Sequence, residues 1–508
     1  MLRIVQTENG TVRGLPAADP RVTSFKGIPY AAPPVGDNRW RAPQPCPNWD
    51  GVRDAYDFAP ISLQDTPGLG TDIYCREWHV DANIPISEDS LYLNVWTNAT
   101  STTDRLPVLV FIHGGALQWG YSSEMEFDGE RIARRGIVVV TMNYRLAVMG
   151  FLAHPDISEE QPDAPANFGN LDQQAALRWV QRNIAAFGGD PNNVTLGGQS
   201  AGGFSVLAQM ASDTKEILFH KAIVISGMIR NPYETDLRIA PKSLRQAEQA
   251  GVEFFKTLGV SSLKEARQLD AFYIREKYAP YAQTCLFMPC IDGVFCKEDP
   301  YVTFLTLRRH RIPVIAGNTI DEFFGFINAL DEAELTKKSE EIFADKAKTF
   351  LDFPESKTKV EQGYAPANSI ETGIKAAFHA EQMSDSPVPC YYYRFMPDIP
   401  GDDHPGAFHS CDLWFFFETL AKCSRPYQGK HYDLARLMCN YISNFIKSGD
   451  PNGLDSDGST MPLWAPYQNG HRAGIEFGDN GAVPSDEENP YMIFLSEHLY
   501  QNITGKEQ

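Results

Sequence analysis

Short, continuous apolar runs recur along the chain and are separated by stretches with helical spacing of apolar residues. The runs are Pro107–Ile112, Ile137–Met142, Val194–Leu196, Lys221–Ser226, Pro313–Gly317 and Cys390–Phe395. Such runs, without alternating polar positions, are typical of strands covered on both faces. Between two of them, residues 172–186 carry apolar side chains at positions 175, 176, 179, 180 and 184, which predicts an amphipathic helix. This alternation predicts an α/β fold around a mostly parallel sheet.

Two regions depart from this alternation. The N-terminal residues alternate around Glu8-Asn9-Gly10, which predicts a β-hairpin closed by an Asn-Gly turn. Residues from about 230 to 380 are richer in amphipathic helix, for example 243–259 and 335–351. We expect this region to form a cap inserted into the sheet or a helical subdomain beside it. By length the chain could form three domains, although α/β folds often run longer as one unit, and no internal repeat or linker is evident.

The net charge of the chain disfavours some classes of binding partner. The chain has 508 residues, with 65 acidic side chains against 45 basic ones and a net charge of −20. This balance argues against binding to nucleic acid or to anionic membranes, both of which need basic patches. Membrane insertion is not expected either, because no apolar run approaches the about 18–20 residues of a membrane helix. Whether the protein is a monomer or a dimer stays open.

The cysteines indicate a reducing environment. There are nine, an odd number, and they are too sparse for a disulfide framework, so we expect reduced and mostly buried thiols. Cys285, Cys290 and Cys296 lie close together in sequence but lack the CxxC spacing that is typical of zinc sites. The N-terminal sequence MLRIVQTENGTVRG has no apolar signal-peptide core, and we expect a cytoplasmic protein.

The candidate chemistry begins at Ser200. The sequence Gly198-Gln199-Ser200-Ala201-Gly202 matches G-x-S-x-G, a pattern whose small residues let a strand-to-helix turn close tightly and expose the serine oxygen. The required context is present, since a predicted strand precedes the pattern and a helical pattern follows it. Because functional loops of parallel sheets lie beyond the carboxyl ends of the strands, we interpret Ser200 as a nucleophile rather than a turn residue.

A serine nucleophile needs a base, a group that orients the base, and donors for an oxyanion. His113-Gly114-Gly115-Ala116 follows the run Pro107–Ile112 and provides a small-residue loop with backbone N–H groups for the oxyanion.

The acid and the base are less definite. For the acid, the adjacent Asp321 and Glu322 both follow the run Pro313–Gly317, and the pattern does not choose between them. Among eleven histidines, His404 precedes a proline in a predicted turn, whereas His409 lies among small residues. The chain order serine, acid, histidine is that of α/β-hydrolases.

With these motifs together, the sequence resembles the type B carboxylesterases, which include bacterial para-nitrobenzyl esterases and animal carboxylesterases and cholinesterases. The resemblance covers nearly the whole chain. Its blocks are FKGIPYAAPPVGDNRW (25–40), SEDSLYLNVW (87–96), VFIHGGA (110–116), MNYRLAVMGFL (142–152), NFGNLDQQAALRWVQRNIAAFGGDPNNVTLGGQSAGG (167–203), DE (321–322), GAFHSCDL (406–413) and FIKSGDPNG (445–453).

The resemblance implies that residues 1–508 form a single α/β-hydrolase domain with a deep active-site gorge. It also implies hydrolysis of carboxylic esters through an acyl-enzyme, with no metal or organic cofactor. Carried over by motif, Ser200 is the nucleophile, Glu322 the acid and His409 the base. The implied oxyanion site consists of Gly114, which shapes the loop, and the N–H donors Gly115, Ala116 and Ala201. The resemblance also implies that Ser226 helps to hold the acid in position.

Four positions depart from the family pattern. One is Ala116, which stands at the last position of the HGGG-type loop and still supplies an N–H. Secreted members have a disulfide-forming cysteine where Ser90 stands, which agrees with a reducing compartment. Cholinesterases carry an acid before the nucleophile, but this chain has the neutral Gln199, which removes one reason to expect a quaternary-ammonium substrate. Asp412 replaces the usual glutamate, and we expect a structural role for it.

The substrate is less well specified than the reaction. Aromatic and apolar residues near the motifs are candidates for the substrate pocket, although plain core packing is an equally good interpretation of each. They are Trp119, Tyr121, Leu286, Phe287, Met288 and Trp414, of which residues 286–288 are candidates for an acyl pocket. The same catalytic groups serve amides, carbamates and bulky feruloyl-type esters, and some family members are non-catalytic binding proteins, so these alternatives stay open.

Overall fold

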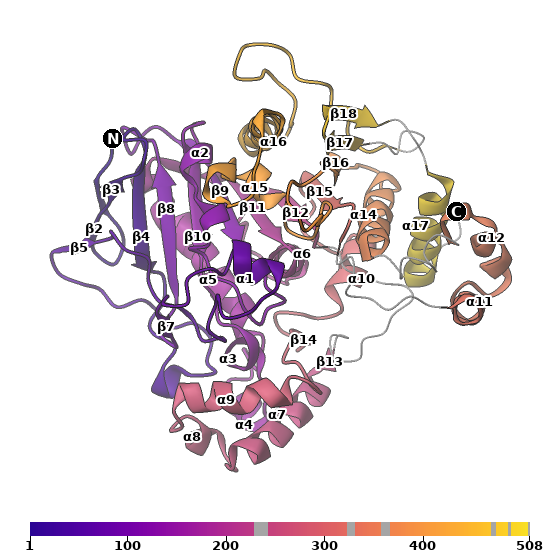
Figure 1. Ribbon diagram of the computed structural model, residues 1–508. Coiled ribbons are helices and arrows are strands. Elements are labelled where there is room, and N and C mark those ends of the chain that lie inside the picture. Colours follow the sequence, from indigo (N-terminus) through magenta and orange to yellow (C-terminus); the bar gives the residue numbers. More distant parts are fainter. Residues whose placement is uncertain (228–241, 323–330, 357–365, 469–473, 486–488, 506–508) are drawn as a thin grey trace. The chain divides into compact units, whose positions relative to one another are not determined.

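The structure is a computed structural model that describes residues 1–227, 242–322, 331–356, 366–468, 474–485 and 489–505 (Figure 1). The chain divides into two compact units. Unit 1 consists of Met1–Lys221, Asp236–Pro300 and Ala421–Ser424, and unit 2 of Ala222–Thr235, Tyr301–Leu420 and Arg425–Gln508.

Unit 1 contains a six-stranded run of a mixed sheet in the order β11-β9-β10-β8-β4-β3. β9, β10 and β11 are parallel, and β8, β4 and β3 continue the sheet with antiparallel pairings. The bounds are β3 (Leu15–Pro16), β4 (Thr23–Pro29), β8 (Tyr92–Thr97), β9 (Leu106–Ile112), β10 (Val138–Met142) and β11 (Gly189–Gln199). Every residue of β10 is buried, as its uninterrupted apolar run predicts.

Shorter strands complete unit 1. The predicted N-terminal hairpin is confirmed, since Gln6 pairs with Thr11 across the Asn-Gly turn in an antiparallel register. The strands are β1 (Ile4–Gln6), β2 (Thr11–Arg13), β5 (Val52–Asp54), β6 (Ile61–Ser62), β7 (Ile86–Ser87), β13 (Lys242–Ser243) and β14 (Cys290–Ile291).

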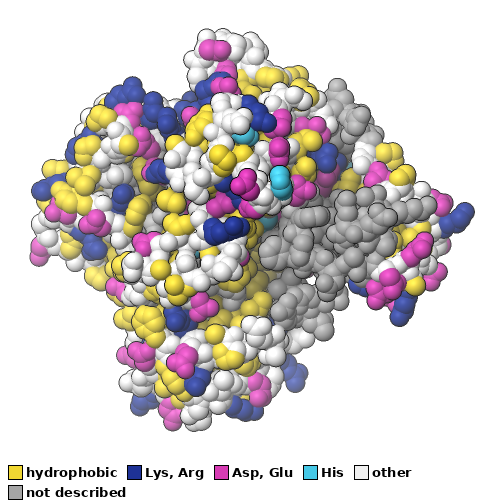
Figure 2. Space-filling view, in the orientation of Figure 1, with side chains coloured by type: hydrophobic (Ala, Val, Ile, Leu, Met, Phe, Trp, Pro, Cys, Tyr) yellow, Lys and Arg dark blue, Asp and Glu magenta, His cyan; other side chains and the backbone are white. Residues whose placement is uncertain are grey.

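The helices of unit 1 include the predicted helix before Ser200 and three helices from the region expected to be helix-rich. The predicted helix is confirmed as α5 (Phe168–Asn183), which a 3₁₀ turn over Ile184–Phe187 extends before Gly188 ends it in a left-handed conformation. The others are α1 (Ile73–Glu77), α2 (Glu130–Ala133), α3 (Ala147–Phe151), α4 (Pro155–Glu160), α6 (Ala201–Ala211), α7 (Leu244–Leu258), α8 (Leu263–Ala266) and α9 (Ala271–Tyr281). In Figure 1, α7, α8 and α9 gather at the lower edge, and Figure 2 shows acidic and basic side chains interspersed over that area.

Unit 2 has its own run of sheet in the order β12-β15-β16-β17-β18. The first four strands are parallel and β18 is antiparallel to β17. The bounds are β12 (Lys221–Ile225, in unit 2 from Ala222 on), β15 (Val314–Thr319), β16 (Cys390–Phe395), β17 (Gly474–Gly478) and β18 (Gly481–Ser485). The strands predicted from the apolar runs at 221, 313 and 390 are therefore confirmed.

The α-helices among the described residues of unit 2 are α10 (Pro300–Leu305, in unit 2 from Tyr301 on), α11 (Glu332–Phe343), α12 (Ala347–Asp352), α14 (Pro366–Gln382), α15 (Leu413–Phe416), α16 (Gly429–Ser448) and α17 (Pro490–Thr504). α14 packs along α17 (Figure 1). The helix-rich region predicted for 230–380 is thus divided between the two units, and its residues 230–241, 323–330 and 357–365 lie outside the described residues.

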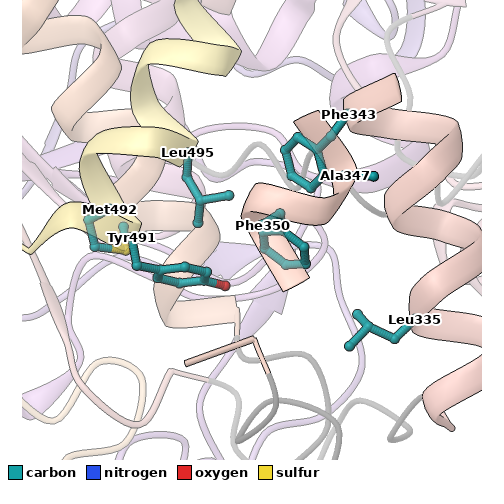
Figure 3. Packing of buried hydrophobic residues seen from close by; sticks show 7 residues of the cluster. All are labelled: Leu335, Phe343, Ala347, Phe350, Tyr491, Met492 and Leu495. Carbon is teal, nitrogen blue, oxygen red and sulfur yellow. The ribbon is translucent and has the colours of Figure 1, made fainter. Parts of the chain in front are cut away.

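One helix predicted from the sequence is interrupted. Residues 335–351 are divided between α11 and α12, with a 3₁₀ turn between them, because Ala344 has φ 50° and ends α11. The break lets Phe343 stack on Phe350 with ring centroids 4.7 Å apart. Figure 3 shows both rings with Leu335 and Ala347 beside Tyr491, Met492 and Leu495 of α17. Packing against α17 therefore overrides the continuous helical pattern.

Candidate active site

Ser200 occupies a strained turn between a strand and a helix in unit 1. β11 ends at Gln199, α6 begins at Ala201, and Ser200 between them has φ 55° and ψ −122°. A residue with a side chain rarely adopts these angles, and such strain persists where the surrounding structure enforces it, most often at functional sites. The turn therefore fixes the position of the Ser200 side chain between the carboxyl end of β11 and the start of α6.

Two glycines of the G-x-S-x-G motif provide the clearance for this turn. A Cβ at Gly198 would lie 2.3 Å from the carbonyl oxygen of Gly202, and a Cβ at Gly202 would lie 2.1 Å from the carbonyl oxygen of Ile112. Neither position accepts a side chain without a backbone shift. The start of α6 consequently lies directly against the end of β9.

The loop after β9 runs beside Ser200. A Cβ at Gly114 would lie 2.8 Å from Oε1 of Gln199 and 3.2 Å from Cβ of Ser200. The next two residues, Gly115 and Ala116, have φ 98° and 53°. The N–H of Ala201, at the first position of α6, has no acceptor within the helix. The loop 114–116 and the start of α6 are thus neighbouring segments of unit 1, and the role of their backbone N–H groups as oxyanion donors stays a prediction.

Glu322 and His409 form a buried pair in unit 2. Nδ1 of His409 is hydrogen-bonded to Oε2 of Glu322, and the side chains are 5% and 0% exposed. The other oxygen of Glu322 accepts hydrogen bonds from the hydroxyl of Ser226 and from the N–H of Thr319, the latter at 3.1 Å. A neutral imidazole that donates from Nδ1 carries its lone pair on Nε2, so this pair has the arrangement of a general base and the carboxylate that orients it.

The alternatives at the acid and the base occupy different environments. Asp321, the neighbour of Glu322, accepts a hydrogen bond from the N–H of Ala407 at 2.8 Å, and its own N–H donates to the carbonyl of Ala407 at 3.1 Å. It thereby anchors the loop that leads to His409. His404 is exposed in a turn with φ 44°, whereas His409 is buried against Glu322.

A second buried carboxyl group belongs to the surroundings of this pair. Oδ2 of Asp412 accepts a hydrogen bond of 2.9 Å from the hydroxyl of Tyr393, and both side chains are fully buried. Burial, reinforced by the negative charge of Glu322, raises the pKa of Asp412 to about 7. Asp412 therefore changes charge near neutral pH.

The sequence profile of the carboxylesterase family matches residues 2–375 and 367–492. The chain belongs to the carboxylesterase family. It is 33% identical over 481 residues to para-nitrobenzyl esterase of Bacillus subtilis (strain 168), an alignment that covers 89% of this chain and 91% of the relative. It is also 33% identical over 439 residues to fumonisin B1 esterase of Sphingopyxis macrogoltabida, covering 82% and 75%.

Solved structures agree with this membership. A para-nitrobenzyl esterase superposes with a TM-score of 0.77 at 28% identity over 97% of this chain and 99% of that one. A Geobacillus stearothermophilus carboxylesterase does so with a TM-score of 0.76 at 28% identity over 97% and 100%. The carboxylesterase has the α/β-hydrolase fold and is a serine ester hydrolase.

The residues predicted for the substrate pocket of the carboxylesterase differ in exposure. Trp119 is 48% exposed beside the loop 114–116, whereas Tyr121 is buried and donates to the carbonyl of Trp78 at 3.4 Å. Leu286 and Met288 are half-buried, and Phe287 is buried. Trp414 of α15 is fully buried in unit 2. A role in substrate binding stays a prediction for each of them.

The cysteines of the carboxylesterase described by the structure are free thiols. Burial raises the pKa of Cys296 to about 12, so this side chain stays protonated at neutral pH. Within the described ranges, no group of three or more His, Cys, Asp or Glu side chains has a geometry that would hold a metal ion. None of the helices in these ranges combines the length and apolarity that a bilayer crossing needs.

Sequence reasoning missed two neutral side chains that hold the loop 114–120 of the carboxylesterase. Nε2 of Gln118 donates to the carbonyl of Phe287 at 3.1 Å. Gln64 donates to the carbonyl of Gly120 at 3.0 Å and accepts from the N–H of Gly120 at 2.8 Å. Neither glutamine belongs to a recognisable motif, since each acts through a partner far away in the sequence.

Proposed function

We propose that the carboxylesterase hydrolyses carboxylic esters through an acyl-enzyme on Ser200. In the first step, the hydroxyl oxygen of Ser200 attacks the ester carbonyl carbon while Nε2 of His409 accepts the hydroxyl proton. Backbone N–H groups of Gly115, Ala116 and Ala201 donate hydrogen bonds to the oxyanion that forms. His409 then transfers its proton to the leaving alkoxide, the bond between the carbonyl carbon and the alcohol oxygen breaks, and the alcohol departs.

The second step removes the acyl group. A water molecule attacks the acyl-enzyme as His409 takes its proton, and the proton returns to the oxygen of Ser200 as the acid is released. The carboxylate of Glu322 stabilises the imidazolium form of His409 in both steps. Every group in this scheme is a side chain or backbone amide, so it needs neither a metal nor a cofactor.

The observation that carries the proposal is the strained turn at Ser200 beside Gly114, together with the buried Glu322–His409 pair. The nucleophile and the oxyanion donors belong to unit 1, and the acid and base belong to unit 2. We propose that residues 1–508 act as a single catalytic domain.

The decisive experiment combines titration with mutagenesis. A fluorophosphonate probe should label one serine per chain, Ser200→Ala should abolish both labelling and hydrolysis of p-nitrophenyl butyrate, and His409→Ala should lower turnover by about four orders of magnitude or more. His404→Ala is the matched control and should retain wild-type turnover. If the probe labels the wild-type enzyme but the Ser200→Ala variant is still active, the assignment of Ser200 as the nucleophile is contradicted.

For the substrate, we propose neutral carboxylic esters. Gln199 supplies no negative charge beside Ser200, and the position is buried. A panel of p-nitrophenyl esters, an amide, a carbamate, a feruloyl ester and a choline ester tests this proposal. The p-nitrophenyl esters and the feruloyl ester, all of them neutral carboxylic esters, should have the highest kcat/KM, and a preference for the amide, the carbamate or the choline ester would contradict the proposal.

We also propose a reducing, cytoplasmic location. The nine cysteines are free thiols, and Ser90, where secreted relatives carry a disulfide-forming cysteine, has its hydroxyl 3.0 Å from that of buried Ser62. Fractionation of cells that express the natural gene tests the location, and recovery of the protein outside the cytoplasm would contradict it.

A further inference from the structure

Gln118 connects the loop beside Ser200 to a distant segment of unit 1. Its amide nitrogen donates to the carbonyl of Phe287 at 3.1 Å and lies 3.5 Å from the sulfur of Met288. Its amide oxygen accepts a hydrogen bond of 2.7 Å from the hydroxyl of Tyr278 in α9. Both ends of this amide are therefore used, and its orientation is fixed.

Tyr278 closes this network into a ring. The N–H of Phe287 donates to the Tyr278 hydroxyl at 3.1 Å, so this hydroxyl accepts one hydrogen bond and donates another. The Tyr278 ring also packs near Phe287, with centroids 5.6 Å apart, and both stand edge-on to Phe254 of α7. Burial raises the pKa of Tyr278, so the hydroxyl keeps its proton in the physiological range.

The same helix holds the far end of the loop. Arg275, nearly one turn before Tyr278 in α9, donates to the carbonyl of Gln64 at 2.7 Å. The amide of Gln64 in turn makes both hydrogen bonds to the peptide groups of Gly120. α9 thus fixes the loop 114–120 at two points, through one glutamine at each.

We propose that Gln118 and Tyr278 are positioning residues that hold the segment Leu286–Met288 against the loop 114–120, which contains the proposed oxyanion donors and is called the oxyanion loop below. The position of this segment then determines which acyl chains the enzyme accepts. The proposal rests on the assignment of Ser200 and the loop 114–116 given above. Because the carbonyl oxygen of the substrate binds at this loop, a segment hydrogen-bonded to the loop has a fixed distance from the acyl group. A displacement of about 1 Å there lowers reaction rates by orders of magnitude.

Tyr278→Phe tests the proposal, because it removes only the hydroxyl and leaves the N–H of Phe287 and the amide oxygen of Gln118 without this partner. We expect kcat/KM for p-nitrophenyl acetate to fall about tenfold. The ratio of kcat/KM for the octanoate to that for the acetate should shift at least about threefold, since an altered acyl pocket discriminates chain length. All these groups are neutral, so the shape of the pH–rate profile should not change.

Tyr281→Phe is the matched control. Tyr281 lies in the same helix and stacks on Phe287, but its hydroxyl donates to the carbonyl of Ala250 rather than to the oxyanion loop. This variant should have the wild-type kcat/KM for p-nitrophenyl acetate and the wild-type ratio of kcat/KM for the octanoate to that for the acetate. Equal ratios for Tyr278→Phe, Tyr281→Phe and wild type would overturn the proposal.

A double-mutant cycle separates positioning from general destabilisation. If Tyr278 acts through Gln118, the ratio measured for Gln118→Met should match that of Tyr278→Phe, and the double variant should add little. Fully additive effects of the two substitutions on the octanoate-to-acetate ratio would overturn the proposal. If Tyr278→Phe does not fold, Gln118→Met alone supplies the test. Fluorophosphonate labelling of each variant distinguishes the two hypotheses: an unlabelled wild-type enzyme contradicts the role of Ser200, whereas normal labelling with an unchanged ratio contradicts only the positioning role.

Discussion

Asp321 and Ala407 are joined by two hydrogen bonds, one between their backbones at 3.1 Å and one from the N–H of Ala407 to Oδ2 of Asp321 at 2.8 Å. The two residues adjoin the proposed acid and base, since Glu322 follows Asp321 and His409 lies two positions after Ala407. The adjacent residues Asp321 and Glu322 therefore have different roles. Asp321 fixes the loop before His409, and Glu322 contacts the imidazole.

Asp321→Ala should lower kcat about tenfold, because an unsatisfied backbone N–H costs about 1–3 kcal/mol and the loop that positions His409 loses an anchor. Asp321→Asn, which keeps an acceptor oxygen, should recover most of the rate. Hydrolysis of p-nitrophenyl butyrate measures both variants, with Asp402→Ala, an exposed carboxylate of the same loop, as the control. If Asp321→Ala hydrolyses p-nitrophenyl butyrate as fast as the control variant does, Asp321 does not anchor the loop.

Ser226→Ala removes one of the donors to the Glu322 carboxylate. A hydrogen bond to a charged group contributes about 1.5–3 kcal/mol, so kcat/KM should fall by about one to two orders of magnitude. Steady-state kinetics should be compared with Ser443→Ala, which removes the hydroxyl of a buried serine of α16 and should behave as wild type. If both variants lose activity equally, the effect belongs to packing and not to Glu322.

Asp412 should make the stability of the enzyme depend on pH. Its pKa of about 7 in the folded state lies above the value near 4 of an unfolded aspartate, so between these values the folded state binds the extra proton. The free energy of unfolding should consequently fall as pH rises from about 4 to about 7, by at most about 4 kcal/mol for this group.

Asp412→Asn keeps an acceptor for Tyr393 but cannot titrate. Relative to wild type, it should gain stability as pH rises through this range, which denaturant unfolding at pH 5, 6, 7 and 8 measures. A constant difference between the two proteins across these pH values would show that Asp412 does not titrate there.

The strands and the candidate catalytic groups could be predicted because their signals are local. An apolar run such as 138–142 is fully buried, and the glycines around Ser200 stand where a Cβ would collide with neighbouring backbone atoms. In both cases, the residues themselves carry the physical requirement of the conformation.

Features set by distant contacts could not be predicted. The break at Ala344 follows from packing of Phe343 and Phe350 against α17, about 150 residues later in the chain. Gln118 meets Tyr278 across 160 positions, and no periodicity marks either residue. The local pattern alone likewise did not distinguish Asp321 from Glu322. The family resemblance implied Glu322, and the physical difference lies in a distant loop, where Asp321 bonds to Ala407 and Glu322 to His409.

The strain at Ser200 predicts that catalysis costs this enzyme stability. Ser200→Gly and Ser200→Ala both remove the hydroxyl, but only glycine relieves the penalty of a Cβ at φ 55° and ψ −122°. We expect the glycine variant to be more stable than the alanine variant by about 1 kcal/mol, after the greater flexibility of glycine in the unfolded chain is included. Thermal and denaturant unfolding of the two inactive proteins measures this difference directly. Ser123→Gly and Ser123→Ala form the control pair, since Ser123 does not have a positive φ. An alanine variant as stable as the glycine variant would mean that the turn at Ser200 stores no strain.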